Sequence, residues 1–574
     1  MSRFQHFFRL SNIRRIVQLL VFLMFLILLV QTVYPLKSWL PADFFLRLDP
    51  LAAIGTILSA RSAETLLTKF LPAVIIVVLT IFLGRFFCNW ICPLGTTIDF
   101  ADRVIRGKSK WVRPALERSE GKPKLMHTPQ LRNLKYYILG GFLVAGLLSL
   151  QVAWLMDPIP IVTRSYAVTV YSYFSYAANV LLGPLWKVPI VNKVSEPIYG
   201  FLRDNVFLPN SELGYQSITM LHHIAFIAFM GILVLSLLYP RFWCRTLCPL
   251  GALFGLLSKI SLLRWVVDKE KCVECNRCYR ECKTNAILEK GDGYLVQECV
   301  ECFNCQDVCP TGAIKFAFQS PATSLQPTPD PSTHPCPSKG GEGGKREKQY
   351  TPKGLDLSKR RFIQAAALGA VAVPLLKLKP SDRDFPPFLI RPPGSLPEEE
   401  FLDKCIRCAE CMKVCPTNAL QPTLFEAGVE GIGTPKLVPK MGYCDYECNA
   451  CGQVCPTGAI EKLTLTDKKK LKIGTAYFNK NKCYPWNENI NCLVCEEHCP
   501  TPEKSIKFWE VEVLEQKTNK TVIVKRPYVV TETCIGCGIC ENKCPLKEEP
   551  GVRITARGEA RHRERYSGGR GVDE

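Results

Sequence analysis

The chain has 574 residues, a formal net charge of +20 and 29 cysteines. Its length leaves room for several domains, and a chain this long is not a miniprotein held together by disulfides. The basic residues gather beside apolar segments, and they are neither interleaved with aromatic residues nor carried on a recognition helix. This distribution is typical of a membrane protein and disfavours nucleic acid as a partner.

Four apolar runs, near residues 17–36, 66–87, 137–156 and 222–239, approach the roughly 20 residues that cross a bilayer. No small-residue cleavage site follows the first run, so we expect it to remain as an anchor. The loop between the second and third runs is rich in Lys and Arg, which places this loop and the N-terminus in the cytoplasm. The uncharged stretch 166–186 is expected to lie in the outer interface.

The apolar region contains an internal repeat. Each half carries an Asp-Pro pair, an apolar run and a C-x3-C-P-L-G motif. These motifs supply Cys88 and Cys92 in the first half, and Cys244 and Cys248 in the second. Cysteines four residues apart share one face of a helix, so each pair could form a redox dithiol or supply two metal ligands. Packing of small apolar side chains at a helix end is the alternative.

The next segment repeats the spacing C-x2-C-x2-C-x3-C twice between residues 272 and 309. Three thiolates this close can bind one face of a 4Fe-4S cluster, and the fourth reaches the neighbouring cluster. Zinc sites use two separated pairs of ligands, which disfavours a zinc ribbon. The spacing predicts a cytoplasmic two-cluster ferredoxin whose ligand sets are Cys272, Cys275, Cys278 and Cys309, and Cys299, Cys302, Cys305 and Cys282.

Residues 319–357 have few bulky apolar side chains and are expected to form a flexible linker, in which Cys336 has no assigned role. The sequence Ser358-Lys-Arg-Arg-Phe-Ile-Gln, followed by an apolar stretch, matches an internal twin-arginine export signal. A basic-ended amphipathic or buried helix is the alternative. Export of a folded domain suits clusters that are built in the reducing cytoplasm. Residues 358–378 are therefore predicted to anchor an exported domain.

Four more four-cysteine runs follow, and each ends in proline. Two have ferredoxin spacing, one has a first gap longer by one residue, and one has a first gap of eight. They predict four more 4Fe-4S clusters, about six in all, although spacing does not determine which fourth cysteine closes which cluster. The runs are Cys405, Cys408, Cys411 and Cys415; Cys444, Cys448, Cys451 and Cys455; Cys483, Cys492, Cys495 and Cys499; and Cys534, Cys537, Cys540 and Cys544. The charged, Gly-rich tail is predicted to be disordered.

Two resemblances follow from these motifs. Four apolar helices, two C-x3-C-P motifs and a double-cluster ferredoxin over residues 10–318 resemble the NapH/MauN family of membrane ferredoxin-type proteins, which is related to NosR-type and CcoG-type proteins. The segments 391–401 and 442–458, within residues 358–550, resemble the NapG/MauM family of exported ferredoxin-type proteins. The chain thus resembles a fusion of the two, and the first resemblance implies that electrons are taken from quinol.

A quinol proton would need an acceptor near the outer surface, and the nearest candidates are His222, His223, Asp49 and Asp157. An aspartate before a proline is more often a helix-boundary residue. The two histidines are adjacent on one helix, so they cannot ligate one haem from both sides. The sequence contains no C-x-x-C-H haem motif and no Gly-rich dinucleotide fingerprint.

The predicted fold is an α-helical membrane domain of about four spans plus one internal signal-anchor helix, with two small α+β bacterial-ferredoxin-like domains. The predicted function is electron transfer at a bacterial inner membrane, from menaquinol or ubiquinol to a periplasmic reductase or cytochrome. The alternatives are a factor that supplies electrons for maturation of a periplasmic enzyme, and a metal reductase that uses the C-x3-C-P cysteines. The expected domains are 1–265 (membrane), 266–318 (cytoplasmic ferredoxin), 319–357 (linker), 358–378 (signal-anchor), 379–550 (periplasmic four-cluster domain) and 551–574 (tail).

Overall fold

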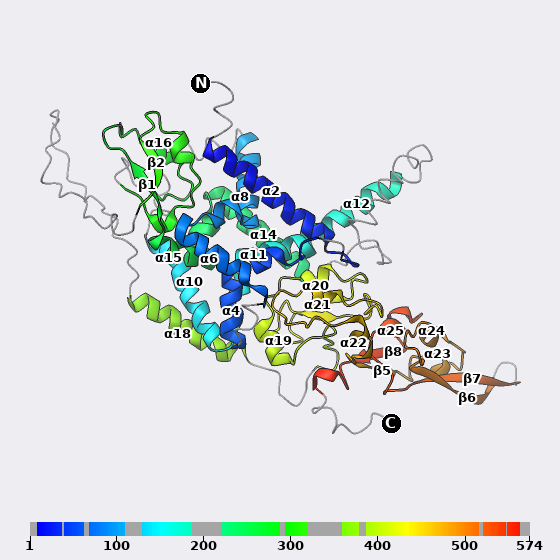
Figure 1. Ribbon diagram of the computed structural model, residues 1–574. Helices are drawn as coiled ribbons and strands as arrows, with labels where there is room; N and C mark the ends of the chain where they lie inside the picture. Colours follow the sequence, from blue (N-terminus) through cyan, green and yellow to red (C-terminus); the bar gives the residue numbers. More distant parts are fainter. Residues whose placement is uncertain are drawn as a thin grey trace. The chain divides into compact units, whose positions relative to one another are not determined.

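The computed structural model describes residues 9–36, 39–61, 68–108, 129–185, 220–287, 293–319, 359–377, 386–515, 520–546 and 548–562 (Figure 1). Cys336, most of the linker predicted at 319–357 and most of the basic loop after residue 108 lie outside the described residues.

Contacts divide the chain into two units, each assembled from three separate stretches. Unit 1 comprises Met1–Phe22, Val74–Gly141 and Leu233–Leu368, and unit 2 comprises Leu23–Ala73, Phe142–Ile232 and Gly369–Glu574. The units therefore do not follow the contiguous domains expected from the sequence. Every division falls inside a helix, namely α2 (Leu10–Gln31), α6 (Leu71–Leu83), α10 (Pro129–Leu147), α14 (Met220–Leu238) and α18 (Lys359–Leu376).

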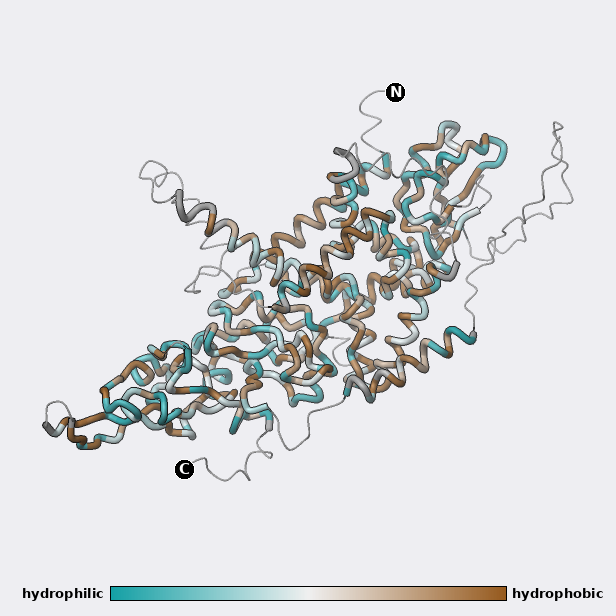
Figure 2. The backbone as a smooth tube through the Cα atoms, turned by 180° about the vertical axis from the view of Figure 1, so that it is seen from behind, coloured by the Kyte–Doolittle hydropathy of each residue, from teal (hydrophilic) through white to brown (hydrophobic). Residues whose placement is uncertain are grey.

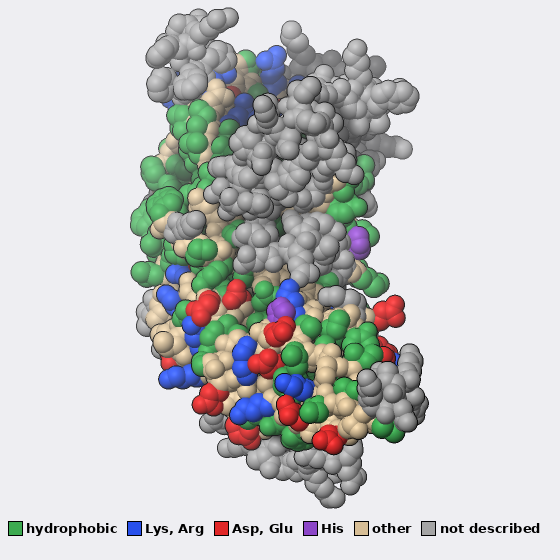
Figure 3. Space-filling view, turned by 90° about the vertical axis from the view of Figure 1, so that its right-hand side faces the viewer, with side chains coloured by type: hydrophobic (Ala, Val, Ile, Leu, Met, Phe, Trp, Pro, Cys, Tyr) green, Lys and Arg blue, Asp and Glu red, His purple; other side chains and the backbone are tan. Residues whose placement is uncertain are grey.

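These five helices form at the four predicted spans and at the predicted signal-anchor. Within the described part of the chain, α2 is the one helix long and apolar enough to cross a membrane, while α6 and residues 222–238 of α14 are apolar but shorter. Hydrophobic residues are concentrated along the helical part of the tube in Figure 2. On the face drawn in Figure 3, hydrophobic side chains dominate one region and Lys, Arg, Asp and Glu side chains are mixed over another. The four-span arrangement stays a prediction.

Unit 1 joins short helices to a ferredoxin module. Its further helices are α7 (Phe87–Trp90), α8 (Pro93–Lys108), the π-helical η4 (Trp243–Leu247), α15 (Pro249–Leu257) and the 3-10 helix η5 (Ser258–Ile260). The module pairs β1 (Leu263–Val267) antiparallel with β2 (Ile314–Phe318). Between the strands lie α16 (Arg277–Glu281), η7 (Val296–Glu298) and α17 (Asn304–Asp307). Its core contains Trp265, Ile287, Cys305 and Ile314.

The first part of unit 2 is helical and contains both Asp-Pro pairs. Its elements are α3 (Phe44–Arg47), α4 (Pro50–Ala60), η2 (Ala153–Leu155), α11 (Pro158–Arg164), the π-helical η3 (Ser165–Val170) and α12 (Tyr171–Leu185). Asp49 caps α4, because its side chain accepts the N–H groups of Leu51 and Ala52. Asp157 occupies the equivalent position before α11, so both aspartates are the helix-boundary residues that the Asp-Pro pattern indicated.

The second part of unit 2 is a C-terminal lobe of short elements around the remaining cysteine runs (Figure 1). Its helices are α19 (Glu398–Lys404), α20 (Glu410–Lys413), α21 (Ala450–Gln453), α22 (Leu465–Lys470), α23 (Tyr484–Asn487), α24 (Val494–Glu497), α25 (Ile539–Lys543) and η9 (Ala560–His562). Its strands form three antiparallel pairs: β3 (Leu420–Pro422) with β4 (Pro435–Leu437), β5 (Thr475–Phe478) with β8 (Val552–Thr555), and β6 (Ile506–Glu515) with β7 (Lys520–Val529).

The prediction of a disordered tail from residue 551 is wrong for the first part of that tail. Strand β8 buries Val552 and Ile554, and the backbone N–H of Ile554 donates to the carboxylate of Glu541 at 2.7 Å. The alternation of apolar and polar residues in Val552-Arg-Ile-Thr was the available signal. Residues after 562 lie outside the described part.

One buried ion pair secures the start of the lobe. The Arg391 guanidinium donates to both Glu398 carboxylate oxygens, at 2.5 and 3.2 Å, and lies over the ring of Phe401. Arg561, just after β8, donates to Glu398 at 3.1 Å and so ties the end of the lobe to its beginning. Burial alone would raise the pKa of Glu398, but the charges of Arg391 and Arg561 outweigh it and lower the pKa to about 2.

We expect Arg391→Met to lower the free energy of unfolding of the lobe by about 1.5–3 kcal/mol, because it removes charged hydrogen bonds from the partly buried Glu398 carboxylate, which keeps Arg561 as a partner. The contribution is fully present above the ordinary glutamate pKa and is lost as the pH falls toward 2. Urea unfolding of the full chain, followed by circular dichroism, measures the change. The control is Lys436→Met, which breaks the more exposed pair with Glu426 and should cost at most about 1 kcal/mol. Equal losses would contradict the role given to Arg391.

Candidate metal centres

The four cysteine runs with ferredoxin spacing share one backbone feature. In each run, the residues directly before and after the second cysteine have a positive φ. These are Glu274 and Asn276, Glu301 and Phe303, Arg407 and Ala409, and Gly536 and Gly538. Non-glycine residues rarely adopt this conformation, so its recurrence at equivalent positions marks a loop shape that function requires. The runs with wider first gaps lack it after the second cysteine, where φ is −132° at Asn449 and −112° at Leu493.

These turns direct backbone N–H groups at cysteine sulfurs. The N–H of Arg407 is directed at Cys405, and that of Gly536 at Cys534. An N–H group directed at sulfur stabilises the thiolate, which is the form of cysteine that binds a metal. In these two loops the left-handed residues therefore place a backbone N–H against the first ligating sulfur, where it opposes the rise in the pKa that burial causes.

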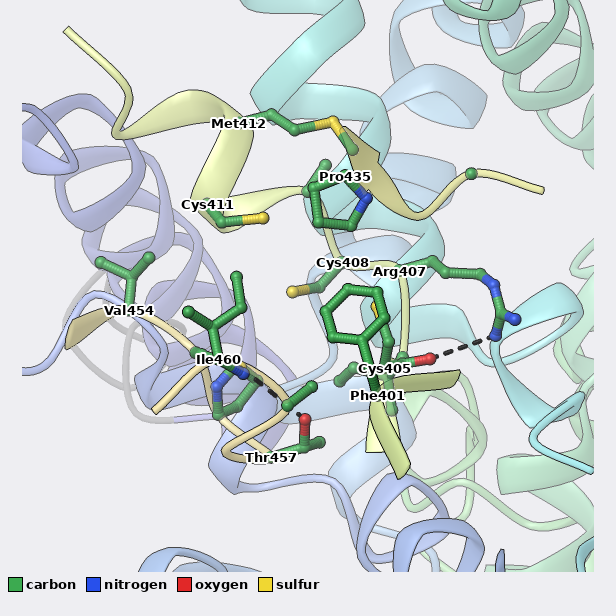
Figure 4. A pocket seen from close by; sticks show the side chains of 16 residues that line it. Phe401, Cys405, Arg407, Cys408, Cys411, Met412, Pro435, Val454, Thr457 and Ile460 are labelled. Atoms are coloured by element: carbon green, nitrogen blue, oxygen red, sulfur yellow. Dashed lines mark hydrogen bonds between the residues drawn. The ribbon is translucent and has the colours of Figure 1, made fainter. Parts of the chain in front are cut away.

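Three cysteines of the third run share a cavity with the last cysteine of the fourth run. Cys405, Cys408, Cys411 and Cys455 line this cavity together with apolar residues that include Phe401. Figure 4 shows the Cys408 and Cys411 side chains directed into the cavity. The arrangement is three thiols from one run and one from its neighbour, as expected for a pair of interlocked 4Fe-4S sites.

The other cysteines of the lobe group in the same way. Cys415 joins the fourth run, because Cys444, Cys448 and Cys451 all interact electrostatically with it. Cys544 joins the fifth run, and Cys499 joins the sixth. We name the resulting groups set C (Cys405, Cys408, Cys411, Cys455), set D (Cys444, Cys448, Cys451, Cys415), set E (Cys483, Cys492, Cys495, Cys544) and set F (Cys534, Cys537, Cys540, Cys499).

The four sets form a series in the order C, D, F, E. Cys411 of set C interacts electrostatically with Cys451 of set D. The backbone N–H of Cys444, in set D, donates to the carbonyl oxygen of Cys537, in set F, at 2.8 Å. Cys540 of set F interacts with Cys495 of set E. The order in space thus differs from the order along the chain, which spacing alone did not reveal.

Unit 1 contains the two sets predicted from the first ferredoxin module. A cavity is lined by Cys282, Cys299, Cys302 and Cys305, which we name set B. In set A, Cys278 interacts electrostatically with Cys272 and Cys275. Its predicted fourth member, Cys309, packs against the same core as Cys278. The structure therefore brings together the four cysteines predicted for set B, and the assignment of Cys309 to set A stays a prediction.

The fourth cysteine of five runs has a threonine partner that the sequence analysis missed. The hydroxyl of Thr457 lies 3.8 Å from the sulfur of Cys455, and that of Thr501 lies 3.2 Å from Cys499. Equivalent contacts of 3.6–3.7 Å occur at Cys282, Cys309 and Cys415. The signal was present as a threonine two residues after the cysteine. A hydroxyl donor at this position can stabilise the ligating thiolate.

The cavities fit a cluster better than a single ion. Among the described residues, no group of three or more His, Cys, Asp or Glu side chains is placed to hold one metal ion. A single zinc would need its sulfurs about 2.3 Å from one point. Thiols that surround a cavity, as in sets B and C, suit the larger cube of iron and sulfide.

The four cysteines of the C-x3-C-P-L-G motifs come together in unit 1, and we call them the tetrad (Cys88, Cys92, Cys244, Cys248). All four are buried, and Cys248 interacts electrostatically with the other three. The expectation that each pair lies on one face of a regular helix is wrong. Helix α7 ends at Trp90, η4 is a π-helical turn, and a proline begins a new helix after the second cysteine of each pair.

An arginine three residues before each motif extends the repeat, which now reads R-F-x-C-x3-C-P-L-G, and the sequence analysis missed it. Arg241, from the second half, donates to the side chain of Asn89 inside the first motif. Arg85, from the first half, lies against Gly251 of the second motif, where an added Cβ would stand 3.0 Å from the guanidinium. Each half therefore supports the cysteine pair of the other half.

The two Asp-Pro aspartates come together in unit 2. Asp49 and Asp157 are both buried, and their carboxyl groups interact with each other. Burial raises the pKa of Asp49 to about 6, and burial together with the charge of Asp49 raises the pKa of Asp157 well above its ordinary value. Two carboxyl groups in contact cannot both ionise easily, so this pair holds a proton near neutral pH.

The acid pair lies beside the ligand loop of set C. The N–H of Asp157 donates to the carbonyl oxygen of Ala153 at 3.0 Å, in the same turn as Trp154. The Trp154 ring contacts two guanidinium groups, that of Arg407 at 4.5 Å and that of Arg164 at 5.3 Å from the ring centre. Since Arg407 stands between Cys405 and Cys408, one turn of chain and one stacked ring separate the acid pair from set C.

The candidate histidines have other contacts. His223 on α14 interacts through Nδ1 with the hydroxyl of Tyr173 on α12, and the two rings are 5.9 Å apart. His222, its neighbour, is buried. The acid pair is thus the candidate proton site that the described contacts connect to a cysteine set.

Three family models match the chain. One described as "4Fe-4S binding domain" matches residues 66–111 and 221–270, and two described as "4Fe-4S dicluster domain" match 264–310 and 404–459. Together with the cysteine-lined cavities, these matches define the class: an iron–sulfur electron-transfer protein of the ferredoxin type, with several 4Fe-4S centres.

Similar proteins of known family narrow this class further. Methylamine utilization ferredoxin-type protein MauM of Methylorubrum extorquens is 34% identical over 29% of this chain and 73% of its own length. Ferredoxin-type protein NapG of Escherichia coli is 30% identical over 36% of this chain and 91% of its own length. The chain belongs to this NapG/MauM family of ferredoxin-type proteins. The putative electron transport protein YccM of Escherichia coli is 24% identical over 44% of this chain and 56% of its own length. No solved structure matches.

The pairing of the fourth cysteines can be tested by iron content. We expect Cys405→Ser with Cys455→Ser, two changes within set C, to remove one cluster, about four iron and four sulfide per chain. Cys405→Ser with Cys415→Ser touches sets C and D and should remove about twice as much. The measurement is iron and acid-labile sulfide in the anaerobically purified full chain. Equal losses in the two double variants would contradict the pairing.

Proposed function

We propose that the protein is a membrane-bound quinol dehydrogenase that delivers electrons, through 4Fe-4S clusters held by sets A to F, to a periplasmic reductase or cytochrome. The observation that carries the proposal is the proximity, within unit 2, of a proton-holding carboxyl pair and the ligand loop of set C. Oxidation of a quinol releases protons and electrons together, so its site needs a proton acceptor beside an electron acceptor.

The acid pair supplies the proton acceptor. Asp49 has a pKa of about 6, so its carboxylate is available to take a proton at neutral pH, and Asp157 keeps the shared proton. A base with a pKa close to the working pH is the effective choice for such a transfer. Asp49 becomes protonated as the pH falls below 6, and the rate of quinol oxidation should fall with it.

The contact of the Trp154 ring with the Arg407 guanidinium supplies the connection to set C. Burial lowers the pKa of Arg407 to about 10, which leaves it protonated at neutral pH. A fixed positive charge between two ligating thiolates favours the reduced, more negative state of the centre that they hold. Bound 4Fe-4S clusters supply one-electron transfer. The contacts that link the sets support a route away from the acid pair in the order C, D, F, E.

The membrane location is supported by α2, whose exposed side chains include Leu19, Leu20 and Ile27. Exposed apolar residues on α6 and α14, such as Ile75 and Ile227, fit lipid contact at further spans. The positive-inside rule then puts the ferredoxin module of residues 266–318 in the cytoplasm, and the twin-arginine-like signal puts the C-terminal lobe in the periplasm. In this topology, quinol oxidation beside set C delivers electrons on the periplasmic side directly.

We expect a menaquinol analogue to bleach part of the cluster absorbance of the detergent-solubilised, anaerobic full chain, and a quinone-site inhibitor to block the bleaching. Asp49→Asn should lower the initial rate by about 100-fold or more and abolish the rise in rate as the pH passes 6, because the base is lost. The endpoint with dithionite should be unchanged. The control is Asp43→Asn, which removes another buried carboxylate of unit 2, one that pairs with Arg47.

Two outcomes would count against the proposal. If quinol does not reduce the wild-type protein although dithionite does, quinol is not the donor, and an electron-supplying maturation factor becomes the better explanation. If Asp49→Asn and Asp43→Asn both keep the wild-type rate, the acid pair is not the proton acceptor.

A further inference from the structure

We propose that the tetrad of unit 1 (Cys88, Cys92, Cys244, Cys248) holds an additional 4Fe-4S cluster, with two ligands from each half of the internal repeat. The site is separate from sets A to F, and the inference does not depend on quinol as the donor.

The first support is the reciprocal construction of the site. Arg241 of the second half holds Asn89, which directly follows Cys88, and Arg85 of the first half lies against Gly251, which closes the second motif. An added Cβ at Gly95 would stand 2.6 Å from the carbonyl oxygen of Cys88, and one at Gly251 would stand 3.3 Å from that of Cys244. The glycines of the two motifs thus allow the same tight turn around each cysteine pair, which small apolar packing residues would not require.

The second support is the hydrogen bonding of the sulfurs. The Sγ of Cys248 accepts the backbone N–H of Gly251 at 3.2 Å, and the N–H of Gly95 is directed at Cys92 in the same way. Sulfurs of the ferredoxin sets accept equivalent bonds, for example Cys282 from Ala286 at 3.2 Å. Backbone N–H groups at both second cysteines are thus placed to donate to a ligating sulfur, as in the ferredoxin sets.

The third support is the charge of the surroundings. Asp99 forms ion pairs with Arg14, Arg241 and Lys283, and Glu298 forms ion pairs with Arg85 and Lys135. Each of these two carboxylates thus faces more than one cation, and Arg85 and Arg241 also interact electrostatically with Cys244 of the tetrad. Buried cations are costly unless anions balance them. Clusters with four thiolate ligands are anionic, whereas two disulfides are neutral.

The fourth support is position. The indole N–H of Trp90, inside the first motif, donates to the carbonyl oxygen of Glu301 at 3.2 Å, in the ligand loop of set B. Arg85 donates to the carbonyl oxygen of Gln297 at 2.6 Å. The tetrad therefore stands next to set B and would extend the series of sets A and B by one centre. The family model for a 4Fe-4S binding domain also covers both motifs, and its two matched ranges contain no other cysteines.

The test compares the full-length protein with a variant that carries Cys88→Ser, Cys92→Ser, Cys244→Ser and Cys248→Ser. We expect the anaerobically purified variant to contain about four iron and four sulfide fewer per chain than wild type. Its electron paramagnetic resonance spectrum should lose one reduced-cluster signal and keep the others. The control, Cys336→Ser, removes a thiol from the linker and should change neither iron nor spectrum.

A redox dithiol and a single metal ion give different results. A dithiol would leave iron and sulfide unchanged and lower only the count of titratable thiols, and a single ion would be lost without sulfide. Either result would overturn the inference. If the fourfold variant does not accumulate, Cys248→Ser alone decides the matter, because an exchange of one ligand must alter or remove one cluster signal, and an unchanged spectrum rules the cluster out.

Discussion

The constraint on which both units depend is the need to bring four thiols around one centre when the chain supplies them in runs of limited reach. A run of C-x2-C-x2-C can surround part of a centre only if the chain turns back on itself at the middle cysteine. The left-handed residues on both sides of that cysteine, such as Arg407 and Ala409, make this turn. The fourth thiol must then come from elsewhere, so every centre ties two runs together.

The supply of each fourth cysteine by a different run determines the architecture of the C-terminal lobe. Sets C and D exchange Cys455 and Cys415, and sets E and F exchange Cys544 and Cys499. Each exchange brings together cysteines that are far apart in the sequence. The segment between Cys499 and Cys534, both of set F, contains the hairpin of β6 and β7. The hydrogen bond from Cys444 to Cys537 then joins the two interlocked pairs. The series C, D, F, E follows from these links and not from the order of the runs.

Spacing predicted the members of set B and the helices at the apolar runs, because both depend on residues within a short stretch of the chain. It could not predict the partners of Cys415 or Cys499, since those depend on how distant runs fold together. The same limit applies to the tetrad. The repeat was visible in the sequence, but the hydrogen bond from Arg241 of one half to Asn89 of the other was not. Strand β8 was missed because its alternating pattern is short and the residues around it are charged and Gly-rich. Its partner strand, β5, also lies about 75 residues earlier in the chain.

The internal repeat explains why the chain has two composite sites. Each half contributes one Asp-Pro to unit 2 and one cysteine pair to unit 1, and at both places the two contributions meet. When a duplicated segment meets its own copy, identical groups are brought face to face. For aspartates this contact favours a shared proton, because two adjacent carboxylates repel each other. For cysteine pairs it gathers four sulfurs that neither half has alone. A proton-holding pair and a four-thiol site are therefore two results of one duplication, and the chemistry of each follows from the residue type that the repeat places there.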